Sequence, residues 1–329
     1  MDEVVYASVL TSLLATLFMT QKWIGKAISI GIVGKDMNKP DKPEVAEMGG
    51  VGVVFGFVLG VLMYIGINTF YFQSRDYLSV LAVLCTVLMI TIIGILDDIL
   101  GWKKGITQWK KPLLTIPAAV PIMVINAGHS TMNLPIIGPV DWGILYPLAI
   151  VPIGIVGASN AYNMLAGYNG LEAGMGAIIL STLGYVAYVN NKIGASVLAF
   201  CMVGALLAFL YFNWYPAKVF PGDSMTYSVG ALVACTAILG DMEKIAVLLF
   251  IPYVIDFILP MRKGLKVEAF AKVNDDGSLE QPYDKIYDTS HLAIAVLKRV
   301  KSKVYEKDVV LFLCGIELVL VGLVWVVYL

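Results

Sequence analysis

The chain has 329 residues, of which 59% are hydrophobic and only 14% are charged, and its mean hydropathy is +0.81. Soluble domains carry about 25% charged residues, so this composition excludes a disordered chain, a nucleic-acid-binding protein and an ordinary soluble enzyme. The net charge of −1 indicates no partner by itself. The composition therefore predicts an integral membrane protein.

Apolar stretches long enough to cross a bilayer, or nearly so, recur along the whole chain. They are predicted at about 4–20, 49–70, 78–96, 113–126, 143–159, 173–189, 193–212, 225–240, 245–260 and 309–328. Each must be helical, because lipid offers no hydrogen-bond partners to the backbone. We therefore expect an all-α fold of about ten transmembrane helices, forming one polytopic domain over residues 1–329.

The loops between these helices fall into two sets that differ in charge. One set carries 20 Lys and Arg residues, and it comprises 21–48, 97–112, 160–172, 213–224 and 261–308. The opposite set carries only Arg75, Lys192 and Lys244. Because positive residues are retained on the inner side, the first set is predicted to be cytoplasmic and both termini to lie outside.

The run Gly94-Ile95-Leu96-Asp97-Asp98 places two adjacent carboxylates at the cytoplasmic end of the third predicted helix. Such a pair is either a solvated helix end or a site for magnesium or proton transfer, since hard divalent cations prefer carboxylate oxygens. In the following loop, Lys110 and Lys111 either meet an anionic group or anchor the topology at lipid headgroups.

The cytoplasmic segment 160–172 has no Lys or Arg but contains Asn160, Asn163 and Asn169 together with Gly167 and Gly170. A helix-terminating turn explains the glycines but not the three asparagines. This composition favours a tight turn whose amides bind a ligand.

The segment 213–224 combines aromatic residues, a Pro-Gly turn and one carboxylate. Phe220 can stack on a base and Asp223 can bind a metal; the alternative is an interfacial aromatic belt followed by a helix cap. Asp256 lies inside the ninth predicted helix, near its cytoplasmic end, where it is either functional or a hydrogen-bonded structural acid. We expect Asp256 and Asn160 to contact the site residues rather than the substrate.

All these groups converge on one membrane face, as phosphoryl transfer requires, because its catalysis is largely positioning and charge neutralisation. The chain has no GxxxxGK[ST] motif, so it is not a P-loop ATPase. A secondary transporter that binds a coupling ion at its acids would place them near the midplane of two similar halves. A non-catalytic scaffold would not need acids in three separate loops.

The segments Asn163–Gly174 and Asn213–Asp223, together with the first-loop run Gly34–Lys39, resemble the motifs of a known family. The chain resembles the polyprenyl-phosphate N-acetylhexosamine-1-phosphate transferases, and within them the eukaryotic and archaeal UDP-GlcNAc:dolichyl-phosphate GlcNAc-1-phosphotransferases. The resemblance implies attack by dolichyl or another polyprenyl phosphate on the β-phosphorus of UDP-GlcNAc, with release of UMP, as the first step of lipid-linked oligosaccharide assembly for N-glycosylation.

The same resemblance implies roles for individual residues. Asp97, Asp98 and Lys111 are expected to be catalytic. Asp223 and Asn163 are expected to hold Mg²⁺, with Mn²⁺ as the alternative metal. The expected catalytic site thus faces the cytoplasm and is shared by three loops.

The UDP-sugar is expected to contact Asn169, Phe220, Gly170, Glu47 and Lys110. Within this set, Asn169 and Phe220 resemble the uracil contacts, by a hydrogen bond and by stacking. Lys110 is also a rival of Lys111 for the phosphates. Other partners that the resemblance implies are membrane lipid and a second copy of the chain in a homodimer.

Departures from the family pattern bear on the sugar and on the membrane. Related eukaryotic enzymes carry an Arg-His-Arg-type stretch in the last loop, where this chain has Lys266, Glu268 and Lys272. The same chemistry on another UDP-N-acetylhexosamine, such as a GalNAc or a modified GlcNAc unit, is therefore the alternative. The compact chain and short last loop favour an archaeal-type plasma membrane over the endoplasmic reticulum.

The last cytoplasmic loop, 261–308, has two predicted elements. Residues 267–273 alternate apolar with polar and precede the turn sequence Asn274–Gly277, which predicts a small β-hairpin. Apolar residues then recur every four positions from Leu292 to Val304, with Lys and Arg between them. This pattern predicts a basic amphipathic helix on the inner leaflet.

Overall fold

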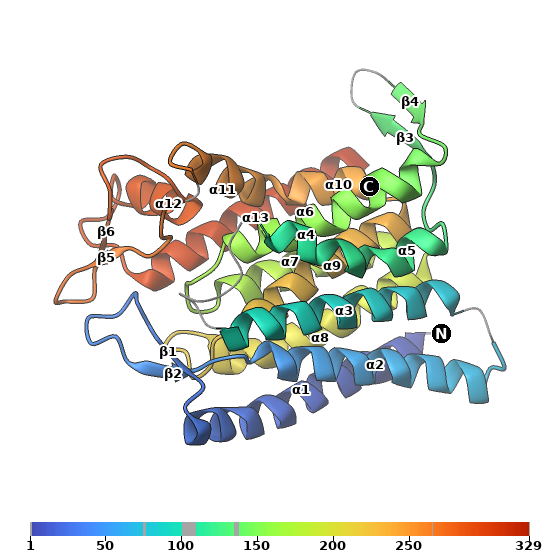
Figure 1. Ribbon diagram of the computed structural model, residues 1–329, viewed down its shortest axis with the longest axis horizontal. Coiled ribbons are helices and arrows are strands. Elements are labelled where there is room, and N and C mark those ends of the chain that lie inside the picture. Colours follow the sequence, from blue (N-terminus) through green and yellow to red (C-terminus); the bar gives the residue numbers. More distant parts are fainter. Residues whose placement is uncertain (1, 75–76, 101–109, 135–137, 265, 329) are drawn as a thin grey trace.

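The computed structural model describes residues 2–74, 77–100, 110–134, 138–264 and 266–328. Its long helices run side by side along one axis of an elongated bundle (Figure 1). These are α1 (Asp2–Ile30), α2 (Gly50–Phe70), α3 (Leu78–Leu100), α7 (Leu171–Val189), α8 (Ile193–Asn213), α9 (Asp223–Gly240) and α13 (Glu306–Tyr328). Residues 101–109, in the predicted loop 97–112, lie outside the described residues.

Shorter helices fill the remainder of the bundle, and proline accounts for their breaks. They are α4 (Lys111–Thr115), the 3₁₀ turn η1 (Ile116–Ala119), α5 (Val120–Val124), the π-helical turn η2 (Tyr146–Ile150), α6 (Val151–Met164), α10 (Glu243–Leu249), α11 (Ile251–Met261) and α12 (Thr289–Leu297). Pro112, Pro117 and Pro121 lie in the first turns of α4, η1 and α5. Proline there withholds a backbone donor from the preceding turn, so the apolar segment 111–124 is interrupted.

The predicted membrane character is confirmed, but not the full count of ten spans. Within the described ranges, seven helices are long and apolar enough to cross a membrane, and α10 with α11, bent by 57°, makes an eighth if the pair is one broken span. The other two predicted spans, 113–126 and 143–159, coincide with the interrupted segment α4–η1–α5 and with η2–α6. Large apolar side chains such as Phe18, Ile92 and Val326 are exposed on the long helices, as a lipid-facing surface requires.

The first helix is longer than its apolar stretch. Hydropathy predicts a span that ends at residue 20, whereas α1 continues through Lys22 and Lys26 to Ile30. Neither lysine breaks a helix, and the helix ends where Gly31 adopts a φ of +77°. The last turns of α1 therefore extend into the charged end of the molecule.

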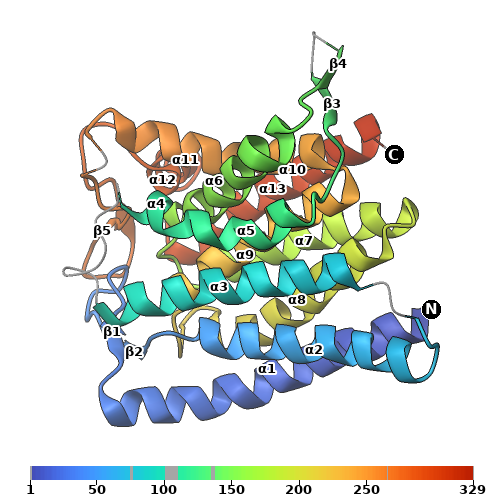
Figure 2. The same cartoon turned by 45° about the vertical axis from the view of Figure 1, so that its right-hand side comes forward.

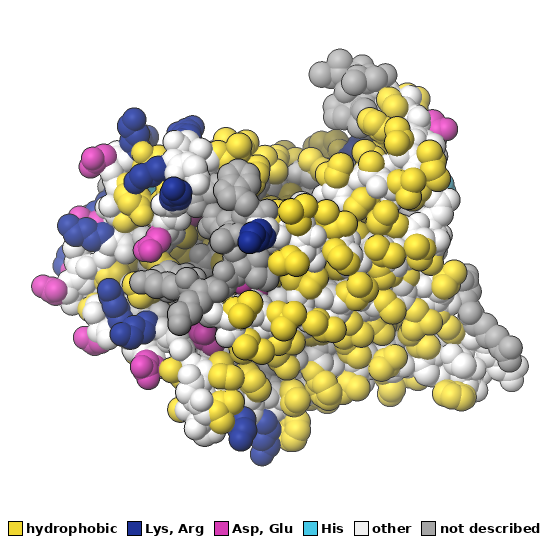
Figure 3. All heavy atoms as spheres, viewed as in Figure 1, with side chains coloured by type: hydrophobic (Ala, Val, Ile, Leu, Met, Phe, Trp, Pro, Cys, Tyr) yellow, Lys and Arg dark blue, Asp and Glu magenta, His cyan; other side chains and the backbone are white. Residues whose placement is uncertain are grey.

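Charged side chains gather at one end of the bundle, whereas hydrophobic side chains cover its length (Figure 3). The N- and C-termini both lie at the opposite end (Figure 1), and the turned view agrees (Figure 2). The loops that the sequence assigns to one membrane face thus meet at the charged end.

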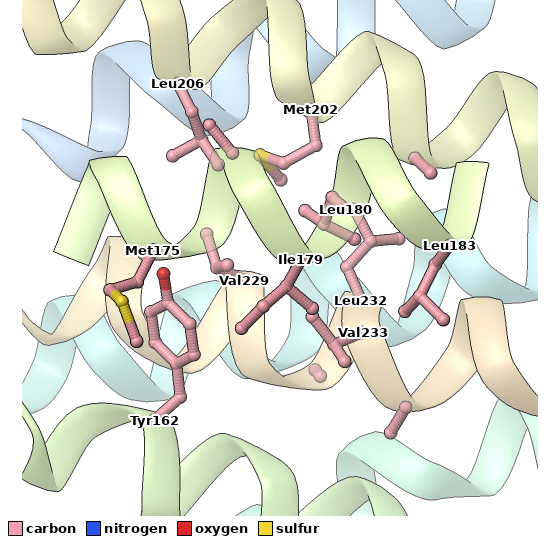
Figure 4. Close-up of a cluster of buried hydrophobic side chains, with 14 of the residues drawn as sticks. Tyr162, Met175, Ile179, Leu180, Leu183, Met202, Leu206, Val229, Leu232 and Val233 are labelled. Carbon is pink, nitrogen blue, oxygen red and sulfur yellow. The ribbon is translucent and has the colours of Figure 1, made fainter. Parts of the chain in front are cut away.

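The core of the bundle lies between four helices that carry the site. Figure 4 shows Ile179 and Leu180 of α7 packed between Met202 of α8 and Val233 of α9, with Tyr162 of α6 reaching in from below. Each of these five side chains is at most 1% exposed. Burying such side chains keeps α6 and α9 in a fixed register, which the site at their ends depends on.

In the described part of the chain, three two-stranded antiparallel sheets lie at the two ends of the bundle. They pair β1 (Val33–Lys35) with β2 (Glu44–Ala46), β3 (Thr131–Leu134) with β4 (Gly138–Asp141), and β5 (Lys272–Val273) with β6 (Leu279–Glu280). The predicted hairpin of the last loop is present only at its tip, around the turn at Asn274–Gly277. Residues 267–271 of the predicted alternating segment 267–273 form no strand.

The prediction of an amphipathic helix in the last loop is wrong in the extent and the placement of the helix. Helix α12 ends at Leu297, before all four basic residues of the predicted helix. Val300 is 81% exposed, whereas Val304 is fully buried and its carbonyl accepts a hydrogen bond from the Leu279 N–H at 2.7 Å. The fourfold spacing predicted a lipid-facing Val304, whereas this residue packs against the β5–β6 hairpin.

Candidate functional site

Three charged side chains from separate segments meet at the charged end of the bundle. The Nζ atom of Lys111 lies 2.7 Å from Oδ2 of Asp97 and 3.0 Å from Oδ2 of Asp223. Asp97 is at the end of α3, Lys111 begins α4, and Asp223 begins α9. The ammonium therefore joins two carboxylates that are 126 positions apart in the sequence.

The second acid of the predicted pair, Asp98, has a different environment from Asp97. Its Oδ1 and Oδ2 accept hydrogen bonds from the backbone N–H groups of Asp223 and Ser224, at 2.7 and 3.1 Å. These are two of the first N–H groups of α9, which have no partner within the helix. Asp98 thus caps α9 from another helix and fixes the residue that carries the Asp223 carboxylate.

Two glycines make this approach possible. A Cβ at Gly94, one turn before Asp97, would lie 2.7 Å from the backbone of Asp223, so α3 packs directly against the start of α9. Gly222 has a φ of +71°, and a Cβ there would lie 2.7 Å from Oδ2 of Asp98. Any larger residue would push the cap away from the helix it caps.

Replacing Asp98 with alanine should lower both stability and activity, because two helix N–H groups lose their acceptors. We expect a loss of about 1–2 kcal/mol in the free energy of unfolding, on the scale of helix-cap removals, measured as a lower melting temperature in detergent. Asp98→Asn, which keeps one acceptor oxygen, should lie between the two. An alanine variant that melts like the unaltered protein would contradict the capping role.

Two of the asparagines position the helices around this cluster. Asn163, at the end of α6, accepts a hydrogen bond through Oδ1 from the Thr226 hydroxyl, one turn beyond Asp223 on α9. Asn160, one turn earlier, donates from Nδ2 to Oγ1 of Thr115 at 3.1 Å. Asn163 is therefore beside the acid cluster, and Asn160 ties α6 to the helix that begins with Lys111.

The loop between α1 and α2 reaches the cluster through the segment before α9. The Phe220 N–H donates to the Ala46 carbonyl at 2.7 Å, and the Phe220 carbonyl accepts from the Gly49 N–H at 2.9 Å. Glu47 lies between these contacts, and its own carbonyl accepts from Nε1 of Trp23 at 2.7 Å. Burial, reinforced by the negative charge of Asp98, raises the pKa of Glu47, so this carboxyl belongs to the same acidic region.

Asn169 and Gly170 lie in a separate part of the charged end, and their hydrogen bonds do not involve Lys111. The Gly170 N–H donates to Oδ1 of Asn213 at 3.1 Å, and Nδ2 of Asn213 donates to the Val219 carbonyl at 2.9 Å. Asn213 thus joins the asparagine-rich turn to the segment that carries Phe220. Two predicted contacts of one substrate are linked by a residue to which the sequence assigned no role.

A buried charged network that the sequence analysis missed surrounds Asn169. It contains Asp36, Lys39 and Glu306, which are 4%, 9% and 2% exposed. Its only sequence signal is the run Gly34–Lys39, which carries part of the family resemblance but no predicted role. Glu306 gave no signal, because an acid at the start of an apolar helix is an ordinary end cap.

Two predicted site residues lie apart from the acid cluster. Lys110 is exposed at the start of α4, which leaves Lys111 as the lysine in contact with the acids. Asp256 is 1% exposed and accepts a hydrogen bond through Oδ1 from the Thr289 N–H at 2.8 Å, where α12 begins. In the structure its contact is with α12, so it anchors the last loop to α11.

The residues present suit a divalent cation that is completed by substrate oxygens. Among the described residues, no group of three His, Cys, Asp or Glu side chains is arranged to hold a metal alone. Asp223 and Asn163 nevertheless offer carboxylate and amide oxygens on adjoining helices, the donors that Mg²⁺ prefers when phosphates supply the rest. The acids of this region, Asp97, Asp98, Asp223 and Glu47, also outnumber the one lysine found in contact with them, so a dication would offset their charge.

Comparison with known proteins identifies the family. A model of glycosyl transferase family 4 matches residues 80–241, the stretch that holds the acid pair, both lysines, the asparagine-rich turn and Asp223. Glu47 and Asp256 lie outside this match.

Several relatives cover most of the chain. A provisionally assigned UDP-N-acetylglucosamine–dolichyl-phosphate N-acetylglucosaminephosphotransferase of Saccharolobus solfataricus is 38% identical over 91% of this chain and 89% of its own length. A protein of the same assignment from Sulfolobus acidocaldarius is 34% identical over 94% and 92% of the two chains. A phospho-N-acetylmuramoyl-pentapeptide-transferase of Streptococcus thermophilus is 33% identical over 77% and 75%. With such identity along nearly its whole length, the chain belongs to glycosyl transferase family 4.

Proposed function

We propose that this protein transfers N-acetylglucosamine-1-phosphate from UDP-GlcNAc to dolichyl phosphate, giving the sugar-diphosphate lipid and UMP. The observation that carries this proposal is the ion-pair cluster in which Lys111 joins Asp97 to Asp223 at the charged end of an apolar bundle. Two relatives assigned to that activity, each covering about nine-tenths of its length, support the choice of substrates.

The residues of the cluster divide the work of this reaction. A new bond forms between an oxygen of the lipid phosphate and the β-phosphorus, and the bond from that phosphorus to the bridging oxygen breaks as UMP leaves. Lys111 neutralises charge on the diphosphate, which is the main requirement of phosphoryl transfer. Asp97, which pairs with Lys111, orients or deprotonates the lipid phosphate beside that lysine, whereas Asp98 holds the start of α9.

Magnesium is the metal we propose, with manganese as the alternative. Asp223 and Asn163 would hold it. When bound, such a cation supplies positive charge to the phosphate oxygens and aligns the two substrates.

For topology, we propose ten membrane crossings, in which α4–η1–α5, η2–α6 and α10–α11 each cross as a broken helix. The charged end, with the cluster, would face the cytoplasm, and both termini would lie outside, as the excess of lysine and arginine in the loops at that end favours. An archaeal-type plasma membrane is the location that we propose.

The test of the function is release of UMP by the purified protein from UDP-GlcNAc and dolichyl phosphate, with magnesium and then with EDTA. We expect release only when lipid phosphate and metal are both present. Substituting UDP-GalNAc separates the proposed sugar from the alternative N-acetylhexosamines. No release with any UDP-sugar from folded protein would overturn the proposal.

Replacing Phe220 with alanine should mainly raise the KM for the UDP-sugar. If its ring stacks on the uracil, alanine removes about 1–3 kcal/mol of binding, the scale of base–aromatic contacts, while the acid cluster remains intact. Steady-state kinetics with the UDP-sugar varied at saturating lipid phosphate measures this change. An unaltered KM would refute the stacking role.

A further inference from the structure

Asn169 is held at two of its nitrogen atoms by the buried network around it. Its backbone N–H donates to Oε1 of Glu306 at 2.8 Å, and its side-chain Nδ2 donates to Oδ2 of Asp36 at 3.0 Å. The two acids come from positions 133 residues before and 137 residues after it. Asn169 itself is 4% exposed, so these contacts determine its orientation.

Lys39 joins the two acids that hold Asn169. Its Nζ lies 3.0 Å from Oδ2 of Asp36 and also pairs with Oε2 of Glu306. The same ammonium lies 4.4 Å from the centre of the Tyr215 ring, and the network is shielded from water. An ammonium has hydrogen-bond donors only, so the Oδ2 atom of Asp36 that faces Lys39 acts as an acceptor.

The same Oδ2 atom of Asp36 fixes which way the amide of Asn169 points. A carboxylate accepts hydrogen bonds from the amide NH₂ but repels the amide oxygen, so the flipped amide is disfavoured. The opposite atom, Oδ1, accepts no hydrogen bond among the contacts of the described residues. Asn169 therefore presents an acceptor, and not a donor, to a ligand that approaches from its free side.

Space for a ligand lies next to this network. A cavity of about 460 Å³ opens between the first and the last cytoplasmic loops. Met37 and Lys39 line one side of it, and Phe270 and Tyr283 line the other. The volume is within the range of small-molecule sites, and the aromatic walls suit a planar ring.

We propose that the Asp36–Lys39–Glu306 network is a specificity device that holds the Asn169 amide as an acceptor, so that the site selects a base with an imide N–H, such as uracil, over cytosine. This rests on the proposed function and on the expected contact of Asn169 with the base of the UDP-sugar. Uracil has an N–H donor at position 3, whereas cytosine has an acceptor nitrogen there. Two facing acceptors leave a buried polar group unpaired, which is the strongest basis for rejection.

The three network residues act through Asn169 and are positioning residues rather than catalytic ones. The test is therefore the ratio of affinities for CMP and UMP, measured by titration calorimetry with the purified full-length protein. We expect the unaltered protein to prefer UMP, and Asp36→Asn to reduce this preference by about tenfold or more, because an amide partner lets Asn169 turn over. A loss of structure alone would weaken both nucleotides and leave their ratio unchanged.

Further variants keep the test decisive if Asp36→Asn folds poorly. Lys39→Met should reduce the preference in the same way, because the acids lose their cation, and Lys39→Arg should restore it. Glu280→Gln is the matched control, since it neutralises an exposed acid whose partner is Lys298 at 2.8 Å, and it should change nothing.

Each outcome separates this inference from the proposed function. Failure of the unaltered protein to bind any uridine nucleotide would overturn the proposed function and the inference together. Binding of UMP with a preference that folded Asp36→Asn and Lys39→Met both retain would overturn the inference and leave the function intact.

Discussion

Replacing Asp223 with alanine should lower the rate of UMP release by about 10²–10³-fold, the usual loss when one electrostatic group of a catalytic site is removed. Asp223 is the proposed metal ligand and one of the two acids that hold Lys111. The fold should survive, because the carboxylate is 25% exposed and Lys111 keeps its contact with Asp97 at 2.7 Å. Initial rates per folded protein, with the melting temperature measured alongside, test this expectation.

A matched control lies at the other end of the same helix. Asp241 follows the last residue of α9 and pairs with Lys192 at 2.6 Å, far along the bundle from the acid cluster. Asp241→Ala should leave turnover nearly unchanged. Near-normal turnover of Asp223→Ala would remove Asp223 from the metal site and from the reaction.

Replacing Lys111 with methionine should lower the rate of UMP release about as much as Asp223→Ala does, and it should also destabilise the protein. The substitution leaves Asp97 and Asp223 close together without the cation that joins them. Because Lys111 and Asp223 are 21% and 25% exposed, we expect the loss to be smaller than the about 3–5 kcal/mol that breaking a fully buried ion pair costs. The expected result is a lower melting temperature and a loss of about 10²–10³-fold in turnover.

The neighbouring lysine provides the comparison. Lys110 is exposed, so Lys110→Met should behave like the unaltered protein in both measurements. Lys111→Arg keeps the charge and should recover the melting temperature while turnover remains low, because the planar guanidinium does not reproduce the position of the ammonium. If Lys110→Met instead lost turnover and Lys111→Met kept it, the two lysines would exchange roles.

Several features of this protein could be predicted from the sequence alone. The membrane character follows from long apolar runs. In a bilayer such a run must form a helix, because lipid offers its backbone no hydrogen-bond partners. Seven of the predicted spans coincide with long helices, and 193–212, for example, agrees with α8 to within one residue. The acids, the lysines and the asparagine-rich turn were identified because polar groups in such a chain stand out against their apolar surroundings.

Other features were decided only by tertiary contacts. Asp97 and Asp98 are two adjacent aspartates, yet Asp97 pairs with Lys111 and Asp98 caps α9. The helix turns by about 100° from one residue to the next, so neighbouring side chains face different partners. No local pattern distinguishes them, since Lys111 lies 14 residues after Asp97 across a loop and the start of α9 lies 125 residues after Asp98.

The same reasoning explains the network around Asn169 and the error in the last loop. Glu306, Lys39 and Asp36 come together only when α13, the first loop and the asparagine-rich turn meet at one end of the bundle. Val304 has the spacing of a lipid-facing residue but is buried against a hairpin. The sequence by itself determined the membrane character and the residue types that the site contains. The packing of the helices decided which charge meets which, because charge pairing depends on distance in space.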